Sequence, residues 1–169
     1  GLVSLMSEMP WPALQMSFQR LADSVPCPGT WVSLGIVLFK KFAGVECIDL
    51  CVDAQNPDDF INCVNCLSPS FGAVNLEDIK GPDCFYVEEK LKQLMNIPVF
   101  HDDQHGTAIV CLAGLINACE ISGKEIKHLK IVCNGAGAAG IACMKLLEAY
   151  GVDPSTLFVC DTNGVIWPG

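Results

Sequence analysis

The sequence has little positive charge. Its 169 residues include 10 Lys and Arg against 19 Asp and Glu, which gives a formal net charge of -9 at pH 7. A protein that binds a phosphate backbone needs a basic surface to neutralise it. The composition therefore argues against nucleic acid as a partner.

The sequence also lacks a long, uninterrupted apolar run. Lys40, Lys41, Glu46 and Asp49 break the richest early stretch, and no segment reaches the roughly 18 apolar residues typical of a helix that crosses a bilayer. We therefore expect no membrane span. Charged residues make up only 17% of the chain and apolar residues 51%, so it can bury a core and is not expected to be disordered.

Cysteine is abundant, with 11 residues. The number is odd and no basic leader with a cleavage site precedes the chain, so the pattern does not indicate a secreted disulfide scaffold. Cys63 and Cys66 form one C-x-x-C, but no second pair stands at the spacing of a zinc site. We interpret them as two thiols on a helix and expect a reducing, cytoplasmic location.

The apolar pattern predicts a mixed α/β protein. The first 35 residues hold four of the ten prolines and show no clear period. From residue 36 onward, short apolar runs alternate with segments of helical spacing, and Asn56 followed by Pro57 is a typical helix start. The expected strands are residues 36–39, 47–52, 74–76, 97–100, 129–133 and 157–160. The expected helices are residues 57–67, 84–95, 106–119 and 138–150, and the third of these is apolar nearly all round, as a buried helix would be.

A glycine-rich loop joins a predicted strand to a predicted helix. Gly135, Gly137 and Gly140 form G-x-G-x-x-G, in which the glycines allow a tight turn, close approach of a pyrophosphate, and close packing of helix on strand. Asp161 ends the next strand, where an acid accepts hydrogen bonds from a ribose hydroxyl. The candidate dinucleotide-binding residues are Gly135, Ala136, Gly137, Ala138, Ala139, Gly140 and Asp161.

Asp161 also bears on the choice of cofactor. Its carboxylate would repel a 2′-phosphate, and residues 162–164 contain no Lys or Arg to neutralise one. We therefore expect NAD, with NADP possible.

Two predicted strands end in paired acids. Glu77 and Asp78 follow one strand, and Asp102 and Asp103 follow the next, at the sheet edge where α/β proteins place their ligands. Clustered carboxylates repel one another unless they are protonated or bind a cation. Oxygen ligands of this kind suit Mg²⁺ or Mn²⁺, although acids in solvated turns have the same composition.

From FKKFAG at residue 39 to Ile166, the sequence resembles the bacterial-type malic enzymes. The resemblance rests on SFGAVNLEDIKGPDCF, NIPVFHDDQHGTAIV and NGAGAAG. It implies oxidative decarboxylation of malate to pyruvate and carbon dioxide by a homo-oligomer that uses NAD(P) and a divalent metal. It assigns the metal ligands to Glu77, Asp78 and Asp103, and it makes Asp102 the neighbouring catalytic acid that tunes the site. The metal would polarise the alcohol for hydride loss and then stabilise the enolate.

Two proton-transfer groups of the family are not found here. Gly35 stands where its general-base Lys is expected, and residues 1–34, which would carry its Tyr, do not resemble the family. Lys40 and Lys41 are nearby, but a shift of one residue along a strand turns the side chain to the other face. We therefore do not expect either lysine to take over the role. General acids and bases typically contribute about 10²–10⁴-fold each, so we expect a fragment without full activity.

The expected architecture is the end of a mixed α/β substrate and metal domain followed by the start of a Rossmann-type NAD(P)-binding domain. We place an unmatched segment at residues 1–35, the first domain at 36–104 and the second at 105–169. Two alternatives stay open: a non-catalytic remnant that binds a nucleotide, and another Rossmann-type oxidoreductase that uses no metal.

Overall fold

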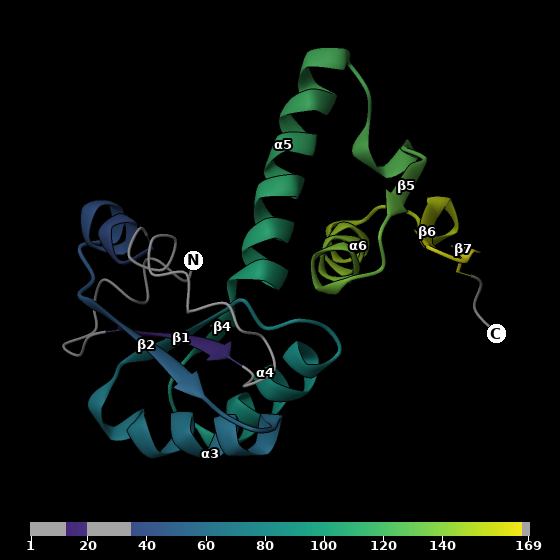
Figure 1. The fold of residues 1–169 in the computed structure, drawn as a ribbon. Helices are drawn as coiled ribbons and strands as arrows, with labels where there is room; N and C mark the ends of the chain where they lie inside the picture. The colour runs from purple at the N-terminus through teal and green to yellow at the C-terminus, as the bar shows by residue number, and fades with distance from the viewer. Residues whose placement is uncertain (1–12, 20–34, 167–169) are drawn as a thin grey trace. The chain divides into compact units, whose positions relative to one another are not determined.

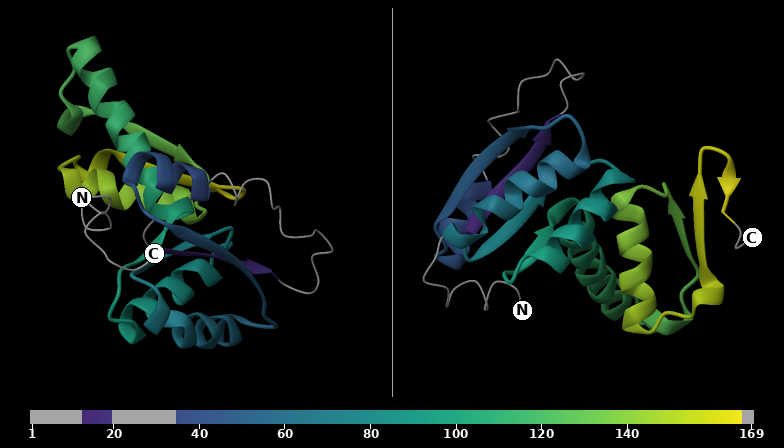
Figure 2. Two further views of the ribbon diagram at one scale, coloured as in Figure 1. Left: turned by 90° about the vertical axis from the view of Figure 1, so that its left-hand side faces the viewer. Right: turned by 90° about the horizontal axis from the view of Figure 1, so that it is seen from below.

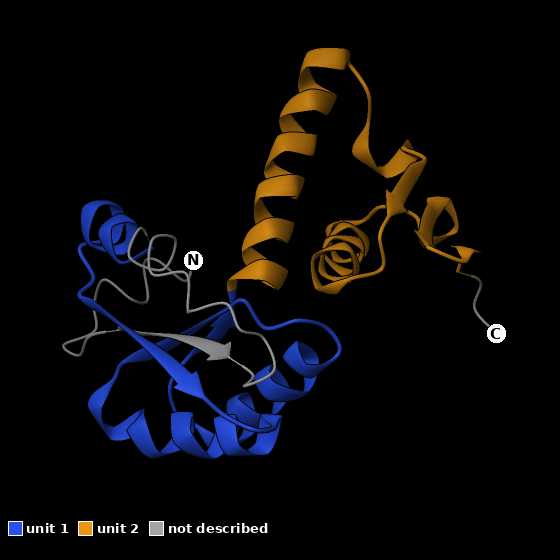
Figure 3. Ribbon diagram, in the orientation of Figure 1, with its two compact units in different colours: residues 1–101 blue, residues 102–169 orange. Residues whose placement is uncertain are grey.

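The structure is a computed structural model that describes residues 13–19 and 35–166 (Figure 1). Most of the predicted unmatched segment lies outside these residues. The chain divides into two compact units, residues 1–101 and 102–169 (Figure 3). Each unit combines helices with a sheet, so the predicted mixed α/β class is confirmed.

The first unit contains a four-stranded parallel sheet with the order β2-β1-β3-β4. Its strands are β1 (Ala13–Gln19), β2 (Cys47–Asp53), β3 (Ala73–Glu77) and β4 (Val99–His101). Leu76 of β3 pairs with His101 of β4, so the carboxyl ends of these two strands meet at one edge. The last three strands were predicted within a few residues, whereas β1 lies in the segment that showed no period.

Helices α3 (Pro57–Leu67) and α4 (Asp83–Leu94) pack side by side along the sheet (Figure 2). Asn56 caps α3 as predicted, because its side chain accepts a hydrogen bond from the Asp59 backbone N–H at 3.0 Å. The fully buried side chains between helices and sheet include Phe60, Val64, Leu76, Val87 and Leu91. Burying each such side chain contributes roughly 1.5–3 kcal/mol, which holds this layer together.

The strand predicted at residues 36–39 is wrong, because the segment is helical. Residues 35–38 form a helical turn that continues as a π-helical turn over Phe39–Ala43. Gly44 ends it in the left-handed region at φ 69°, and its N–H bonds to the Lys40 carbonyl. Gly44 is therefore a helix C-cap, where two strands at residues 36–39 and 47–52 would have required a turn.

Two side chains of α4 face the opposite way from the prediction. On the amphipathic pattern of residues 84–95, apolar Leu94 should face inward and charged Glu88 outward, but Leu94 is 53% exposed and Glu88 is 7% exposed. The Lys92 Nζ lies 2.8 Å from Glu88 Oε1, one turn along the helix. This ion pair offsets the free-energy cost of burying the Glu88 carboxylate.

The cysteines of the first unit match the prediction of free thiols on α3 but not at one residue of β2. Cys63 and Cys66 both lie on α3 and carry free thiols, as predicted. Cys51 of β2 is disulfide-bonded, so the expectation of reduced cysteines is wrong at this residue.

The second unit contains the predicted βαβ arrangement. Strand β5 (Ile131–Asn134) leads into α6 (Ala138–Tyr150) and then into β6 (Leu157–Asp161), which pairs with β5 in parallel. A short strand β7 (Gly164–Val165) adds to β6 in the antiparallel sense. Helix α5 (Thr107–Ser122) packs against α6.

Helix α5 is not buried on all sides, as the sequence led us to expect. Within the described chain it buries only Ala108 and Cys119, while Val110 is 71% and Ile121 is 89% exposed. By length and composition, the 21 residues Asp102–Ser122 would suffice to cross a membrane. However, the uncharged apolar part, residues 107–119, is only about 20 Å long as a helix, short of the roughly 30 Å hydrocarbon core. We therefore keep the expectation of no membrane span.

Candidate functional site

The glycine-rich loop makes its tight turn directly after β5. Gly135 has φ 124°, a conformation that residues with a side chain rarely adopt. Its N–H donates to the Cys160 carbonyl of β6 at 2.9 Å, which fixes the loop to the neighbouring strand. Helix α6 then begins after Gly137, whose carbonyl accepts the N–H of Ile141 at 3.0 Å.

Gly140 lies where the first turn of α6 touches the loop. A Cβ at this position would be 2.0 Å from the Gly135 carbonyl oxygen and 3.2 Å from Cys133 Sγ. No side chain therefore fits between the helix and the end of β5. This is the close packing that the third glycine of the motif was predicted to allow.

Gly137 differs from Gly140, because it is exposed and a Cβ added to it would meet nothing within 4 Å. The space beside its backbone is therefore open to a ligand. The amide groups at the start of α6 have no side-chain cap, and such groups attract phosphate through their N–H donors and the helix dipole. The loop residues thus fit the pyrophosphate of a dinucleotide.

Asp161 lies beside this loop. It ends β6, one residue after Cys160, whose carbonyl holds Gly135. Its Oδ1 accepts the Asn163 N–H at 2.7 Å, which orients the carboxylate at the strand end. A carboxylate retains further acceptor positions for hydroxyl groups. The structure thus brings together the predicted dinucleotide residues on a single unit.

The first acidic pair lies at the end of β3. Glu77 is half-buried, and its Oε1 accepts a hydrogen bond from Asn75 Nδ2 at 2.9 Å. Asn75 is only 3% exposed, so it positions the Glu77 carboxylate from within the sheet. Sequence reasoning missed Asn75. The available signal was strand alternation, which places residues two apart on the same face.

Asp78 leaves β3 in an unusual backbone conformation. Its φ is 56°, the one positive value among the described residues other than glycine. Asp adopts the left-handed region more readily than most residues because its short side chain bonds locally. Backbone outliers of this kind cluster at functional sites, which motivates a functional hypothesis for Asp78.

The second acidic pair lies on a π-helical turn, η3 (Asp102–Gly106), that leads into α5 and packs against α6. The Asp102 side chain folds back over Gly106, where a Cβ would be 2.3 Å from its Oδ1. The carboxylate therefore lies at the N-terminal end of α5, where the helix dipole favours a negative charge. The glycine of DDQHGT makes room for this arrangement, a role that the sequence did not reveal.

The structure does not assemble the predicted metal ligands into one group. Among the residues that it describes, no three or more His, Cys, Asp or Glu side chains are arranged to hold a metal ion. Glu77 and Asp78 belong to the first compact unit and Asp103 to the second. We therefore derive no step through a metal, and these three ligands stay a prediction.

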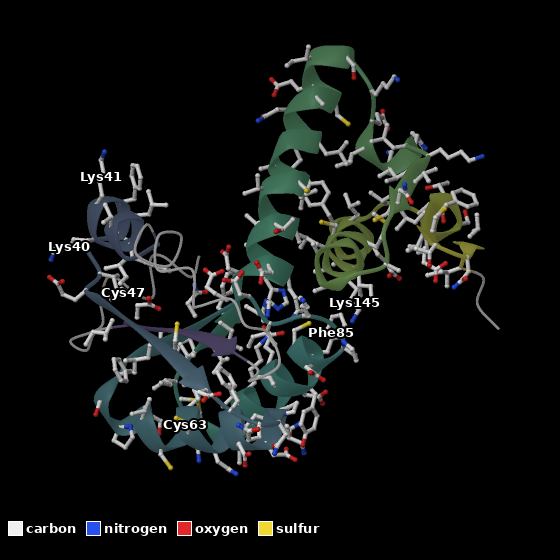
Figure 4. All side chains as sticks on the ribbon, in the orientation of Figure 1. Lys40, Lys41, Cys47, Cys63, Phe85 and Lys145 are labelled. Atoms are coloured by element: carbon white, nitrogen blue, oxygen red, sulfur yellow. The ribbon has the colours of Figure 1, made fainter. Side chains whose placement is uncertain are left out.

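The two lysines near Gly35 lie at the surface of the described structure, which is unusual for a general base. Lys40 and Lys41 lie on the helical segment and are exposed (Figure 4). Lys40 Nζ is also paired with the Glu46 carboxylate. A lysine that serves as a general base is typically buried, and neither of these side chains is.

Comparisons with known proteins find malic enzymes among both the curated relatives and the solved structures. Residues 104–167 match the family model "Malic enzyme, NAD binding domain". The chain is 59% identical over 133 residues to the NADP-dependent malic enzyme of Rhizobium meliloti, covering 79% of this chain and 18% of that protein. It is 49% identical over 133 residues to the NAD-dependent malic enzyme of the same organism, covering 79% and 17%.

Solved structures give the same result. The malic enzyme from Pyrococcus horikoshii superposes with a TM-score of 0.80 at 38% identity, covering 90% of this chain and 38% of that one. Of the two curated relatives from Rhizobium meliloti, the chain spans only about a fifth of the length. The family model includes the glycine-rich loop, and these matches show that the chain is similar to malic enzymes.

Proposed function

We propose that this chain contributes to the oxidative decarboxylation of malate to pyruvate and carbon dioxide with a nicotinamide dinucleotide. The observation that carries the proposal is the loop between β5 and α6. Gly140 packs against Gly135, Gly137 leaves open space, and Asp161 lies beside them. The names of the relatives, which are malic enzymes, supply the substrate class.

Each part of the loop has a distinct task in this proposal. The open backbone at Gly137 and the first amides of α6 bind the pyrophosphate. The Asp161 carboxylate accepts hydrogen bonds from the adenosine ribose. When bound, the nicotinamide ring supplies the hydride acceptor for the C2 hydrogen of malate. The chain's own contribution is thus to bind and orient the dinucleotide.

Asp161 supports NAD as the preferred cofactor, since its charge opposes a 2′-phosphate. The first named relatives are NADP-dependent and another is NAD-dependent, so the names include both cofactors. We expect Asp161→Asn to raise the affinity for NADP relative to NAD. Isothermal titration of both dinucleotides measures this ratio, and an unchanged ratio would contradict the role of Asp161.

Glu77, Asp78 and Asp103 remain our proposed ligands for Mg²⁺ or Mn²⁺, with Asp102 as the neighbouring acid. The support is the oxygen-donor chemistry of the carboxylates and the parallel pairing of β3 with β4, rather than an assembled cluster. Mn²⁺ should raise the unfolding temperature of the chain, and Asp103→Asn should remove this protection. Equal protection of both proteins would remove Asp103 from the site.

The decisive test of the loop is Gly137→Ala. Because a Cβ at Gly137 meets nothing within 4 Å, the substitution should leave folding intact and weaken NAD binding by blocking the pyrophosphate. The matched control is Gly114→Ala in α5, where a Cβ also meets nothing. If both variants bind NAD as the parent does, the loop is not the binding site.

A malate-dependent assay for NADH in the presence of Mn²⁺ separates the proposal from its alternatives. Since Gly35 occupies the position of the expected lysine, we propose slow turnover at most. NAD binding without any turnover supports a nucleotide-binding remnant. The proposed context is cytoplasmic, as part of a homo-oligomer, with neither nucleic acid nor a membrane as partner.

A further inference from the structure

Four cysteines of the second unit gather around strand β5. They come from four different elements, and all four carry free thiols: Cys111 of α5, Cys133 of β5, Cys143 of α6 and Cys160 of β6. Cys143 and Cys111 lie on two helices in contact and are near enough for the Cys111 thiol to shift the pKa of Cys143. Cys133 lies near enough to Cys111 and Cys160 to interact with them electrostatically. None of these four thiols is paired in a disulfide.

Cys111 and Cys143 lie on helices that pack against each other. Cys111 is in the second turn of α5 and Cys143 in the second turn of α6, and these helices are in contact. A disulfide requires an S–S bond of about 2 Å and facing Cβ atoms. Two thiols on packed helices can join through side-chain rotation and a shift of one helix against the other, provided that their Cβ atoms come to face each other.

We propose that Cys111 and Cys143 are a reversible oxidation site that forms a disulfide under peroxide. Cys111 is exposed and Cys143 is half-buried, so the oxidant reaches Cys111 first. The Cys111 thiol reacts with hydrogen peroxide to give a sulfenic acid and one water. The Cys143 thiol then attacks that sulfur, the S–S bond forms, and a second water leaves. Two thiols and one peroxide thus become one disulfide and two waters.

The environment of Cys143 agrees with this division of roles. Burial, and secondly the Cys111 thiol, raise the pKa of Cys143 to about 11. Cys143 therefore keeps its proton at neutral pH and is a poor first target, because the thiolate is the reactive form. It acts instead as the resolving thiol on the neighbouring helix.

The position of the pair links it to the glycine-rich loop, and this part rests on the proposed function. Cys143 lies one helical turn after Gly140, which contacts Gly135 of the loop. Cys133 Sγ lies beneath the same loop, 3.5 Å from the Gly135 carbonyl oxygen. A disulfide that draws α6 toward α5 must move this contact, because no space separates Gly140 from Gly135. We expect weaker NAD binding, by about 5- to 150-fold, as is usual for coupled sites.

The test uses the full chain, reduced and then treated with hydrogen peroxide. Peptide mapping without reductant should find a peptide that joins Cys111 to Cys143, which dithiothreitol removes. Cys143→Ser should abolish the link and leave Cys111 as a sulfenic acid that dimedone captures. The control is Cys63→Ser on α3, which should not affect the link. If the mapped peptides show Cys111 and Cys143 unlinked, or linked to other cysteines, the proposal is wrong.

The mapping needs no variant to fold and no nucleotide to bind, so it decides the oxidation site independently of the proposed function. Titration of NAD into the reduced and oxidised chain then tests the coupling. Equal affinities in both states overturn the coupling. Loss of NAD binding in the reduced chain as well would refute the proposed function, while the disulfide would still be decided by the peptides.

Discussion

Gly140→Ala should destabilise the second unit through a backbone collision. The new Cβ would lie 2.0 Å from the Gly135 carbonyl oxygen, and 3.2 Å from Cys133 Sγ. A backbone carbonyl cannot rotate away as a side chain does, so α6 and the loop have to separate by about 1 Å. Such overpacking costs about 1–3 kcal/mol. The gain from replacing glycine in a helix, about 0.5–1 kcal/mol, offsets only part of this.

Urea unfolding followed by circular dichroism measures the effect. With a slope of about 1–3 kcal/mol per molar urea, the midpoint should fall by roughly 1 M. Gly114→Ala is the control, since it places the same methyl group within α5 where nothing lies within 4 Å. That variant should be stabilised by about 0.5–1 kcal/mol. If the two variants have the same midpoint, the contact between Gly140 and Gly135 does not constrain the fold.

Three further substitutions test other parts of the structure. Asn56→Ala removes the cap on the Asp59 N–H and should cost about 1 kcal/mol, measured as a lower thermal midpoint. Asp49→Asn should stabilise the chain at pH 7, because burial raises the pKa of Asp49. The folded chain therefore takes up this proton first as the pH falls, and the advantage of Asn should vanish near the unfolded pKa of about 4; urea titrations at several pH values check this. Gly106→Ala should displace the Asp102 carboxylate and weaken Mn²⁺ binding in a titration.

Much of the fold follows from local signals that tertiary packing does not override. Asn56 and Pro57 begin α3 in both the prediction and the structure. The strand, glycine-rich loop and helix at Gly135 to Gly140 also agree, because each residue there has a local steric reason. The dinucleotide half of the candidate site is contained in one short βαβ unit, so its residues are brought together by nearby sequence.

The remaining features depend on contacts that one segment does not encode. The four apolar residues at 36–39 are compatible with a strand or a helix. The structure has a helix here, which Gly44 ends in the left-handed conformation. Glu88 is buried because Lys92 accompanies it, which an outward-facing pattern does not reveal. The acidic residues predicted as metal ligands come from β3 and from the turn after β4, so whether they meet depends on long-range structure that no single segment encodes.

The left-handed backbone at Asp78 limits which amino acids that position accepts. A φ of 56° suits Asn and Gly as well as Asp, whereas Val or Ile would clash with the main chain. A mutant library screened only for soluble expression should therefore retain Asn and Gly here and reject the branched residues. The same library screened for Mn²⁺ uptake should retain Asp alone, so two selections on one codon separate the demands of shape from those of charge.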